Sequence, residues 1–148
     1  MITLRKAEAA DIPQLVELLK ELFMLEADFD FDPEKQTAGL NLLLNSEKDC
    51  VLVAHLPGDN KVLGLCSVQT LISTAEGGWV GLLEDLIVAA DFRHQGIASR
   101  LVAEAVAWAE SQGLKRLQLL ADKNNGLALN FYHKQGWQTT KLVCLRKS

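Results

Sequence analysis

Three successive β-type runs in the middle of the chain, with helical patterns before and after them, limit the folds that this sequence can adopt. The runs are Val51–Ala54, Val62–Ile72 and Trp79–Val88. Turn residues at Pro57–Asn60 separate the first two runs, which is the pattern of an antiparallel hairpin. Because each face of a sheet must be buried, we expect the flanking helical segments to cover this one.

Two helices are predicted before the β runs. Asp11 precedes Ile12 and Pro13, so a side-chain acceptor and an early proline mark the start of the first helix. Asp32 and Pro33 mark the second. Apolar residues recur at helical spacing in both segments, which predicts that each helix buries one face. They are Ile12, Leu15, Val16, Leu19, Leu22 and Phe23 in the first helix and Leu40, Leu43 and Leu44 in the second.

The alternation of strands and helices continues after the β runs. An amphipathic helix opens at Arg93–Ala98, and Gly113 stands where a helix-ending glycine belongs. The remaining predictions are a strand over Arg116–Ala121, a helix over Ala128–Gln135 closed by Gly136, and mostly strand over Trp137–Arg146. With a short strand at residues 2–6, the order is β-α-α-β-β-β-α-β-α-β, in one domain spanning residues 1–148.

Charge and composition exclude several classes of function. The formal charge is −4 and no long basic run offsets it, so we predict no nucleic-acid partner. No window approaches the ~18 apolar residues of a membrane span, so we predict no membrane partner. The odd number of cysteines without a C-x-x-C pair predicts buried, reduced thiols and a cytoplasmic location. The cysteines are Cys50, Cys66 and Cys144. The sequence spacing of the histidines is not that of metal ligands, so we predict no metal; they are His55, His94 and His133.

The turn that enters the third helix carries the strongest functional signal. A strand, Leu82–Val88, is followed by a short connector and by Arg93–Ala98 at the helix start. Unpaired amides and a partial positive charge at a helix N-terminus suit a diphosphate, and Gly96 lets an anion approach closely. Arg93 adds a charge that suits phosphate. The turn matches neither a Walker loop nor a dinucleotide fingerprint, and a glycine that only ends a loop remains the alternative.

The motif R-x-x-G-x-A at Arg93–Ala98 resembles the acetyl-CoA signature of the GNAT N-acetyltransferases. Leu83–Val88 followed by Asp91–Arg93 is similar to the diamine (spermidine/spermine) acetyltransferase branch, as is the opening helix. Asn125, Ala128, Phe131 and Tyr132 with Gly136 resemble the second cofactor motif of the family. The resemblance implies an α+β fold of three layers, α/β/α, with a mixed, mostly antiparallel central sheet, and it implies acetyl-CoA as cofactor.

The resemblance also assigns roles around the cofactor. The strand Leu86, Ile87 and Val88 would bond the pantetheine arm, and Asn125 and Ala128 would contact its lower part. Tyr132 would touch the cofactor and protonate the departing sulfur, although it can instead pack a helix against the sheet with Phe131. The diphosphate would be held by Arg93, His94, Gln95, Gly96, Ile97, Ala98 and Ser99.

An amine must lose its proton before it can attack a thioester, so a base is expected. Glu84 matches the carboxylate that serves the diamine branch, acting through a water. A salt-bridged strand residue is the alternative, and Asp85 is a substrate contact or structural. Strand alternation places these two side chains on opposite faces unless a bulge intervenes. A carboxylate inside an apolar strand is expected to have a raised pKa or a partner.

Acidic residues after the first helix predict a cationic acceptor. Glu26 matches an acidic substrate contact of the diamine branch, whereas Asp28, Asp30 and Asp32 read as a solvated turn. The full set of substrate-binding candidates is Glu26, Glu84, Asp85, Gln118, Leu119 and Leu120. Polyamine, thialysine-like and aminoalkylphosphonate acceptors stay open in that order.

Two further functions stay open, acetylation of a protein lysine or N-terminus and a non-catalytic acyl-CoA sensor. A homodimer is expected from the family, with the late β run Gln138–Leu145 as one possible contact.

Overall fold

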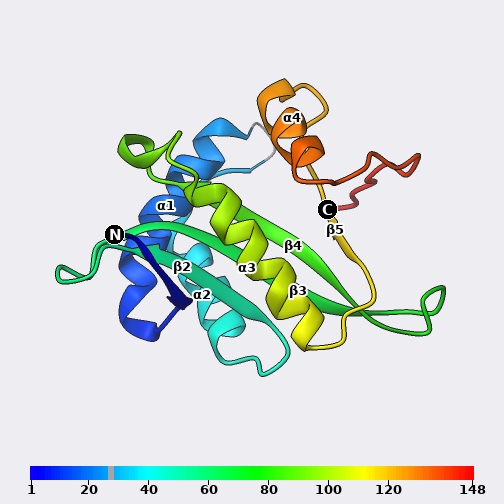
Figure 1. Ribbon diagram of the computed structural model, residues 1–148, viewed down its shortest axis with the longest axis horizontal. Coiled ribbons are helices and arrows are strands. Elements are labelled where there is room, and N and C mark those ends of the chain that lie inside the picture. The colour runs from blue at the N-terminus through cyan, green and yellow to red at the C-terminus, as the bar shows by residue number, and fades with distance from the viewer. Residues whose placement is uncertain (27–28) are drawn as a thin grey trace. The chain divides into compact units, whose positions relative to one another are not determined.

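The computed structural model describes residues 1–26 and 29–148 (Figure 1). The chain divides into two compact units, residues 1–118 and residues 119–148. We describe each unit by itself. Asp28 of the predicted acidic turn lies outside the described residues.

A five-stranded sheet in the order β1-β2-β3-β4-β5 is the centre of the first unit (Figure 1). Strands β1 to β4 pair with one another in antiparallel fashion, which confirms the predicted hairpin. Lys115 N donates to Trp79 O at 2.8 Å and Gly81 N to Arg116 O at 2.8 Å, so the chain entering β5 runs in the same direction as β4. The sheet is therefore mixed and mostly antiparallel, as predicted. The strands are Thr3–Lys6, Cys50–His55, Val62–Ser73, Gly78–Val88 and Leu117–Leu119.

One face of the sheet is covered by helix α3, Ile97–Ser111, which crosses β3 and β4 (Figure 1). The approach is close at Gly64. A methyl group there would lie 3.0 Å from the carbonyl oxygen of Ile87 and 3.2 Å from Cδ1 of Leu101. Glycine at this position therefore allows α3 to pack on the sheet. The predicted end of the helix is confirmed, because Gly113 has a φ of +73°.

The opposite face is covered by helices α1, Ile12–Leu25, and α2, Pro33–Leu44. Their buried apolar side chains form one cluster with alternate residues of the strands. The three-layer arrangement is thus confirmed, as is the predicted inner face of α1. The cluster contains Ile12, Leu15, Val16, Leu18, Leu19, Leu22 and Leu40 from the helices and Val51, Val53, Val62, Leu65 and Ile87 from the strands.

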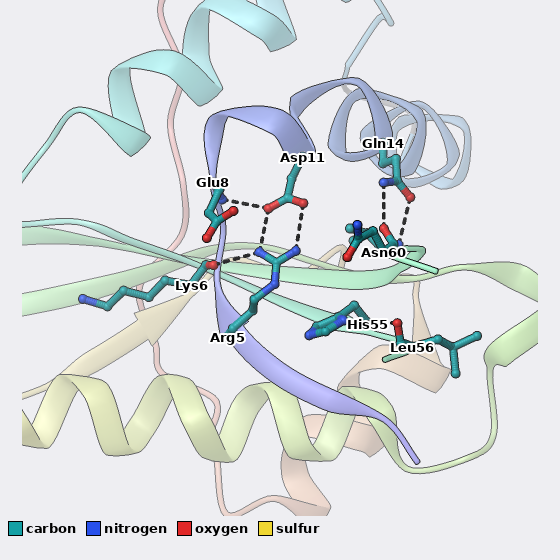
Figure 2. A network of polar contacts seen from close by, with 9 residues as sticks. Arg5, Lys6, Glu8, Asp11, Gln14, His55, Leu56 and Asn60 are labelled. Carbon is teal, nitrogen blue, oxygen red and sulfur yellow. Dashed lines mark hydrogen bonds and ion pairs between the residues drawn. The ribbon is translucent and has the colours of Figure 1, made fainter. Parts of the chain in front are cut away.

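Asp11 corrects one sequence prediction. It precedes α1 as expected, but its side chain makes no capping bond to that helix. Its carboxylate accepts from Arg5 at 2.8 and 3.0 Å and from Glu8 N at 2.7 Å, as Figure 2 shows. The Arg5 guanidinium holds the pKa of Asp11 below its ordinary value. Two charge-assisted bonds from the Arg5 guanidinium are stronger than one capping bond from a backbone amide, so the carboxylate turns toward β1.

Gln14 ties the first turn of α1 to the β2–β3 turn. Its Nε2 donates to Asn60 O at 3.0 Å, and its Oε1 accepts from Val62 N at 2.8 Å (Figure 2). The start of α2 follows the prediction more directly, because Asp32 Oδ1 accepts from Glu34 N at 3.1 Å.

The second unit contains helix α4, Gly126–Lys134. Gly136 follows it with a φ of +92°, which confirms the predicted helix end. The predicted strand over Trp137–Arg146 is wrong, since no strand is present in this described segment. Its large apolar residues Leu142, Val143 and Leu145 are at least 78% exposed, so burial does not stabilise a strand there.

Two of the three cysteines behave as predicted. Cys50 and Cys66 are buried free thiols, and burial raises their pKa values to about 11 and about 12. Cys144 is exposed, so the prediction of a buried thiol is wrong for this residue. None of the described helices is both long enough and apolar enough to cross a membrane.

Candidate active site

A bulge in β4 interrupts the ladder between β3 and β4. Cys66 pairs with Leu86 and Val68 pairs with Leu83, so the one residue between them on β3 faces two residues on β4. These two residues are Glu84 and Asp85. A bulge re-aims the side chains that it contains. The prediction that Glu84 and Asp85 point to opposite faces assumes a strand without a bulge, so it does not apply here; Glu84 is exposed and Asp85 is half-buried.

Asp85 is the carboxylate that the bulge directs toward the protein. Its amide donates to Ser67 Oγ at 3.2 Å, and the Ser67 hydroxyl faces Asp85 Oδ2 at 3.4 Å. The side chain is half-buried. The pKa of Asp85 is raised to about 7, chiefly by burial and then by the charges of Glu84 and Glu26, while the Ser67 hydrogen bond acts in the opposite direction. A carboxyl group with this pKa can both accept and release a proton at neutral pH.

Glu84 and Glu26 complete a group of three carboxylates. Glu84 is exposed on β4, and Glu26 follows the last residue of α1. Both act on Asp85 through their charge. The structure thus brings together three of the predicted substrate-side residues. The raised pKa that the sequence led us to expect of a base is found at Asp85, and the assignment of Glu84 as base stays a prediction.

The predicted diphosphate turn has the backbone that anion binding requires. His94 and Gly96 have φ values of +63° and +80°, and α3 begins directly after Gly96. The N-cap residue, Gly96, makes no side-chain capping bond to the first-turn amides of this helix. A Cβ at Gly96 would have no protein atom within 4 Å. Open space beside first-turn amides fits a diphosphate.

Arg93, whose charge is predicted to suit phosphate, makes two contacts within the protein. Its Nε donates to Val88 O at 2.9 Å, and its Nη2 lies 3.7 Å from Glu21 Oε2. Arg93 therefore links the end of β4 to α1 and braces the turn. Sequence reasoning missed Glu21, whose place on the polar side of α1 gave no signal of this contact. The contact of Arg93 with a cofactor stays a prediction.

The stretch of β4 that is predicted to bond the cofactor, Leu86–Val88, is anchored on one side by β3. Leu86 and Ile87 pair with Cys66 and Leu65, and Ala89 N donates to Leu63 O at 2.7 Å. The bonds toward β5 lie at the opposite end of β4, at Trp79 and Gly81. These bonds toward β5 therefore do not involve Leu86, Ile87 or Val88. The bonding of these three residues to a pantetheine arm stays a prediction.

The predicted site residues of the second unit have local roles. Asn125 Oδ1 caps α4 by accepting from Ala128 N at 3.1 Å. Tyr132 is half-buried and packs edge-on against Phe131 and Trp137, with ring centroids 5.2 and 6.0 Å apart. These contacts fix the ring and leave its catalytic role a prediction. The same holds for the acceptor-side residues Gln118 and Leu119 on β5 and the following, 67% exposed Leu120.

Comparisons with known proteins agree with this geometry. The chain is 26% identical over 133 residues to an uncharacterized N-acetyltransferase of Archaeoglobus fulgidus, which covers 89% of this chain and 90% of that one. Two solved structures have the same fold. A transcriptional regulator from Bacillus halodurans has a TM-score of 0.87 at 23% identity and covers 100% of this chain and 99% of its own. The aminoglycoside N-acetyltransferase AAC(6')-Iy in complex with CoA has a TM-score of 0.85 at 16% identity and covers 100% and 95%.

The family pattern is decisive for identity. The pattern described as the acetyltransferase (GNAT) family matches residues 12–137, which is most of the chain. The match includes the bulge of β4, the diphosphate turn and α4. Enzymes of this family use acetyl-CoA as the acetyl donor. The chain therefore belongs to the GNAT family of acetyl-CoA-dependent N-acetyltransferases.

Proposed function

We propose that this enzyme acetylates the primary amine of a small cationic molecule by direct attack within a ternary complex. The supporting observation is the group of carboxylates at the β4 bulge. Glu26, Glu84 and Asp85 lie close enough for their charges to interact. A polyamine or thialysine-like molecule carries a second ammonium group that such carboxylates would bind. The neighbouring fold of an aminoglycoside acetyltransferase is compatible with a polycationic acceptor.

We place the general base at Asp85. At neutral pH its pKa of about 7 leaves a large fraction ionised and able to accept the ammonium proton, directly or through a water. Glu84 and Glu26 would then hold the distal charge of the acceptor. Glu84 as base, the prediction from sequence, is the competing assignment, and paired variants distinguish the two.

The other predicted site residues would bind and orient acetyl-CoA. Acetyl-CoA supplies the activated acetyl group when it is bound. The amides of Ile97 and Ala98 would hold its diphosphate, and the backbone of Leu86–Val88 would orient its arm beside the base. The Tyr132 hydroxyl would donate a proton to the departing thiolate.

Acceptor profiling tests this proposal. Free thiol release from acetyl-CoA should be measured with diamines, thialysine, an aminoglycoside, an aminoalkylphosphonate and a lysine-containing peptide. We expect diamines or thialysine to give the highest kcat/KM and the peptide the lowest. A profile restricted to peptides would support protein acetylation instead, and CoA binding without turnover on any amine would support a sensor.

We also propose that the enzyme is cytoplasmic and forms a homodimer. Free buried thiols at Cys50 and Cys66 support a reducing, cytoplasmic location. The exposed apolar segment with Leu142, Val143 and Leu145 supports a homodimer. Light scattering of the purified chain should give twice the mass of 16.3 kDa, and a monomer would refute the dimer.

A further inference from the structure

Ser67 is a polar residue in an apolar place. It lies inside β3 with 1% of its surface exposed, between Cys66 at 0% and Val68 at 1%. By strand alternation it shares the α1-facing side with Leu65. A hydroxyl group in such surroundings costs free energy unless its hydrogen bonds are satisfied. The other buried polar side chain among the described residues is Asp11, which Arg5 explains.

Both hydrogen bonds of the Ser67 side chain are made with Asp85. Its oxygen accepts the Asp85 amide at 3.2 Å, an amide that the bulge removes from the regular ladder. Its hydroxyl proton faces Asp85 Oδ2 at 3.4 Å. One small side chain therefore fixes both the backbone and the carboxylate of the same residue. Closing a bulge requires the first of these contacts and does not require the second.

We propose that Ser67 is a positioning residue, which holds the Asp85 carboxylate in the orientation that receives the acceptor's proton. The inference rests on the proposed role of Asp85 as general base. It assigns to an interior serine, which no sequence motif marks, a part in the reaction.

Ser67 affects the pKa of Asp85 in the opposite direction to the acidic groups around it. Glu84 neighbours Asp85 on β4, Glu26 follows the last residue of α1, and Cys66 adjoins Ser67 on β3. The charges of the two glutamates disfavour a further negative charge on Asp85, and Cys66 is a neutral thiol because burial raises its pKa to about 12. Of these groups, the Ser67 hydroxyl is the one whose hydrogen bond lowers the pKa of Asp85. Removing the hydroxyl should therefore move that pKa upward.

The test is Ser67→Ala, with Ser73→Ala as the matched control. Ser73 ends the same strand, and its hydroxyl accepts from Glu76 N at 3.2 Å in a turn remote from the bulge. We expect Ser67→Ala to shift the acid limb of the kcat/KM profile upward by about half to one pH unit. At pH 7, kcat should fall about 3- to 10-fold, with the Kd for CoA unchanged. Ser73→Ala should leave all three quantities unchanged.

A direct titration separates this inference from the proposed function. The Asp85 carboxyl pKa should be followed by carbon-13 NMR in the wild type, in Ser67→Ala and in Ser67→Cys, which keeps a weak donor and serves if the alanine variant does not fold. An upward shift in the variant that folds, together with the altered pH profile, supports the inference. A folded variant with unchanged titration and profile overturns it. If Asp85→Asn keeps full activity, the base assignment fails first.

Discussion

Replacing Asp85 with asparagine should stabilise the protein, and increasingly so as the pH rises. In the unfolded chain this carboxyl group loses its proton near its ordinary pKa of about 3.9, whereas the folded chain keeps the proton up to a pKa of about 7. Folding therefore takes up a proton between these values. Wild-type stability is lost over this window by about 1.4 kcal/mol per pH unit. Asparagine has nearly the same shape, can still accept from Ser67 and does not titrate.

The magnitude follows from the pKa. Because the folded-state carboxyl group is already half ionised at pH 7, the stability advantage of Asp85→Asn should grow by about 2 kcal/mol from pH 5 to pH 7 and level off above pH 8. For a chain of this size that corresponds to roughly 4–8 °C in Tm. Chemical denaturation of both proteins at pH 5, 6, 7 and 8 measures it, because the titration of groups that do not interact with Asp85 cancels in the difference.

A matched control checks that the effect belongs to the bulge. Glu110→Gln neutralises an exposed carboxylate on α3 and should give a difference from the wild type that is small and independent of pH. Parallel stability curves for Asp85→Asn and the wild type from pH 5 to pH 8 would refute the reasoning. They would mean that Asp85 is ionised in the folded protein at little cost.

Three other predictions concern activity and packing. Asp85→Asn should lower kcat, measured by thiol release, about 100-fold, and Glu84→Gln should lower it less than about tenfold. The reverse order would indicate that Glu84 is the general base. Gly96→Ala should weaken CoA binding, measured by calorimetry. Gly77→Ala is the control, because Gly77 has a φ of +70°, close to the +80° of Gly96, and a Cβ at either residue has no protein atom within 4 Å; it should only destabilise the fold by about 1 kcal/mol. Equal CoA affinities of the two variants would contradict the diphosphate turn. Tyr132→Phe should lower kcat at least tenfold with unchanged CoA affinity, and unchanged kcat would leave this ring a packing residue.

The sequence predicted the elements that depend on local pattern. The hairpin of β2 and β3, the buried face of α1 and the glycine at the end of α3 each follow from spacing or backbone conformation within a few residues. The predicted strand over 137–146 failed because β propensity alone does not form a strand without a partner or a buried face.

The details of the site depended on contacts that spacing does not encode. Which of Glu84 and Asp85 points inward is decided by the pairing of Val68 with Leu83 and Cys66 with Leu86, and register between strands is not visible in one sequence. Asp11 was expected to cap a helix and instead pairs with Arg5, six residues earlier. In both cases a tertiary partner decided between two locally acceptable positions.

The extra residue in the β4 bulge is not needed to form the sheet. A chain shortened by Glu84 would keep Leu83 and Leu86 opposite Val68 and Cys66, now in an unbroken ladder, with every core side chain on its present face. The architecture thus has one amino acid more than its own folding demands. A designer who idealised this strand in this way would keep Asp85 opposite Ser67 and would lose the exposed Glu84, and with it one carboxylate of the site.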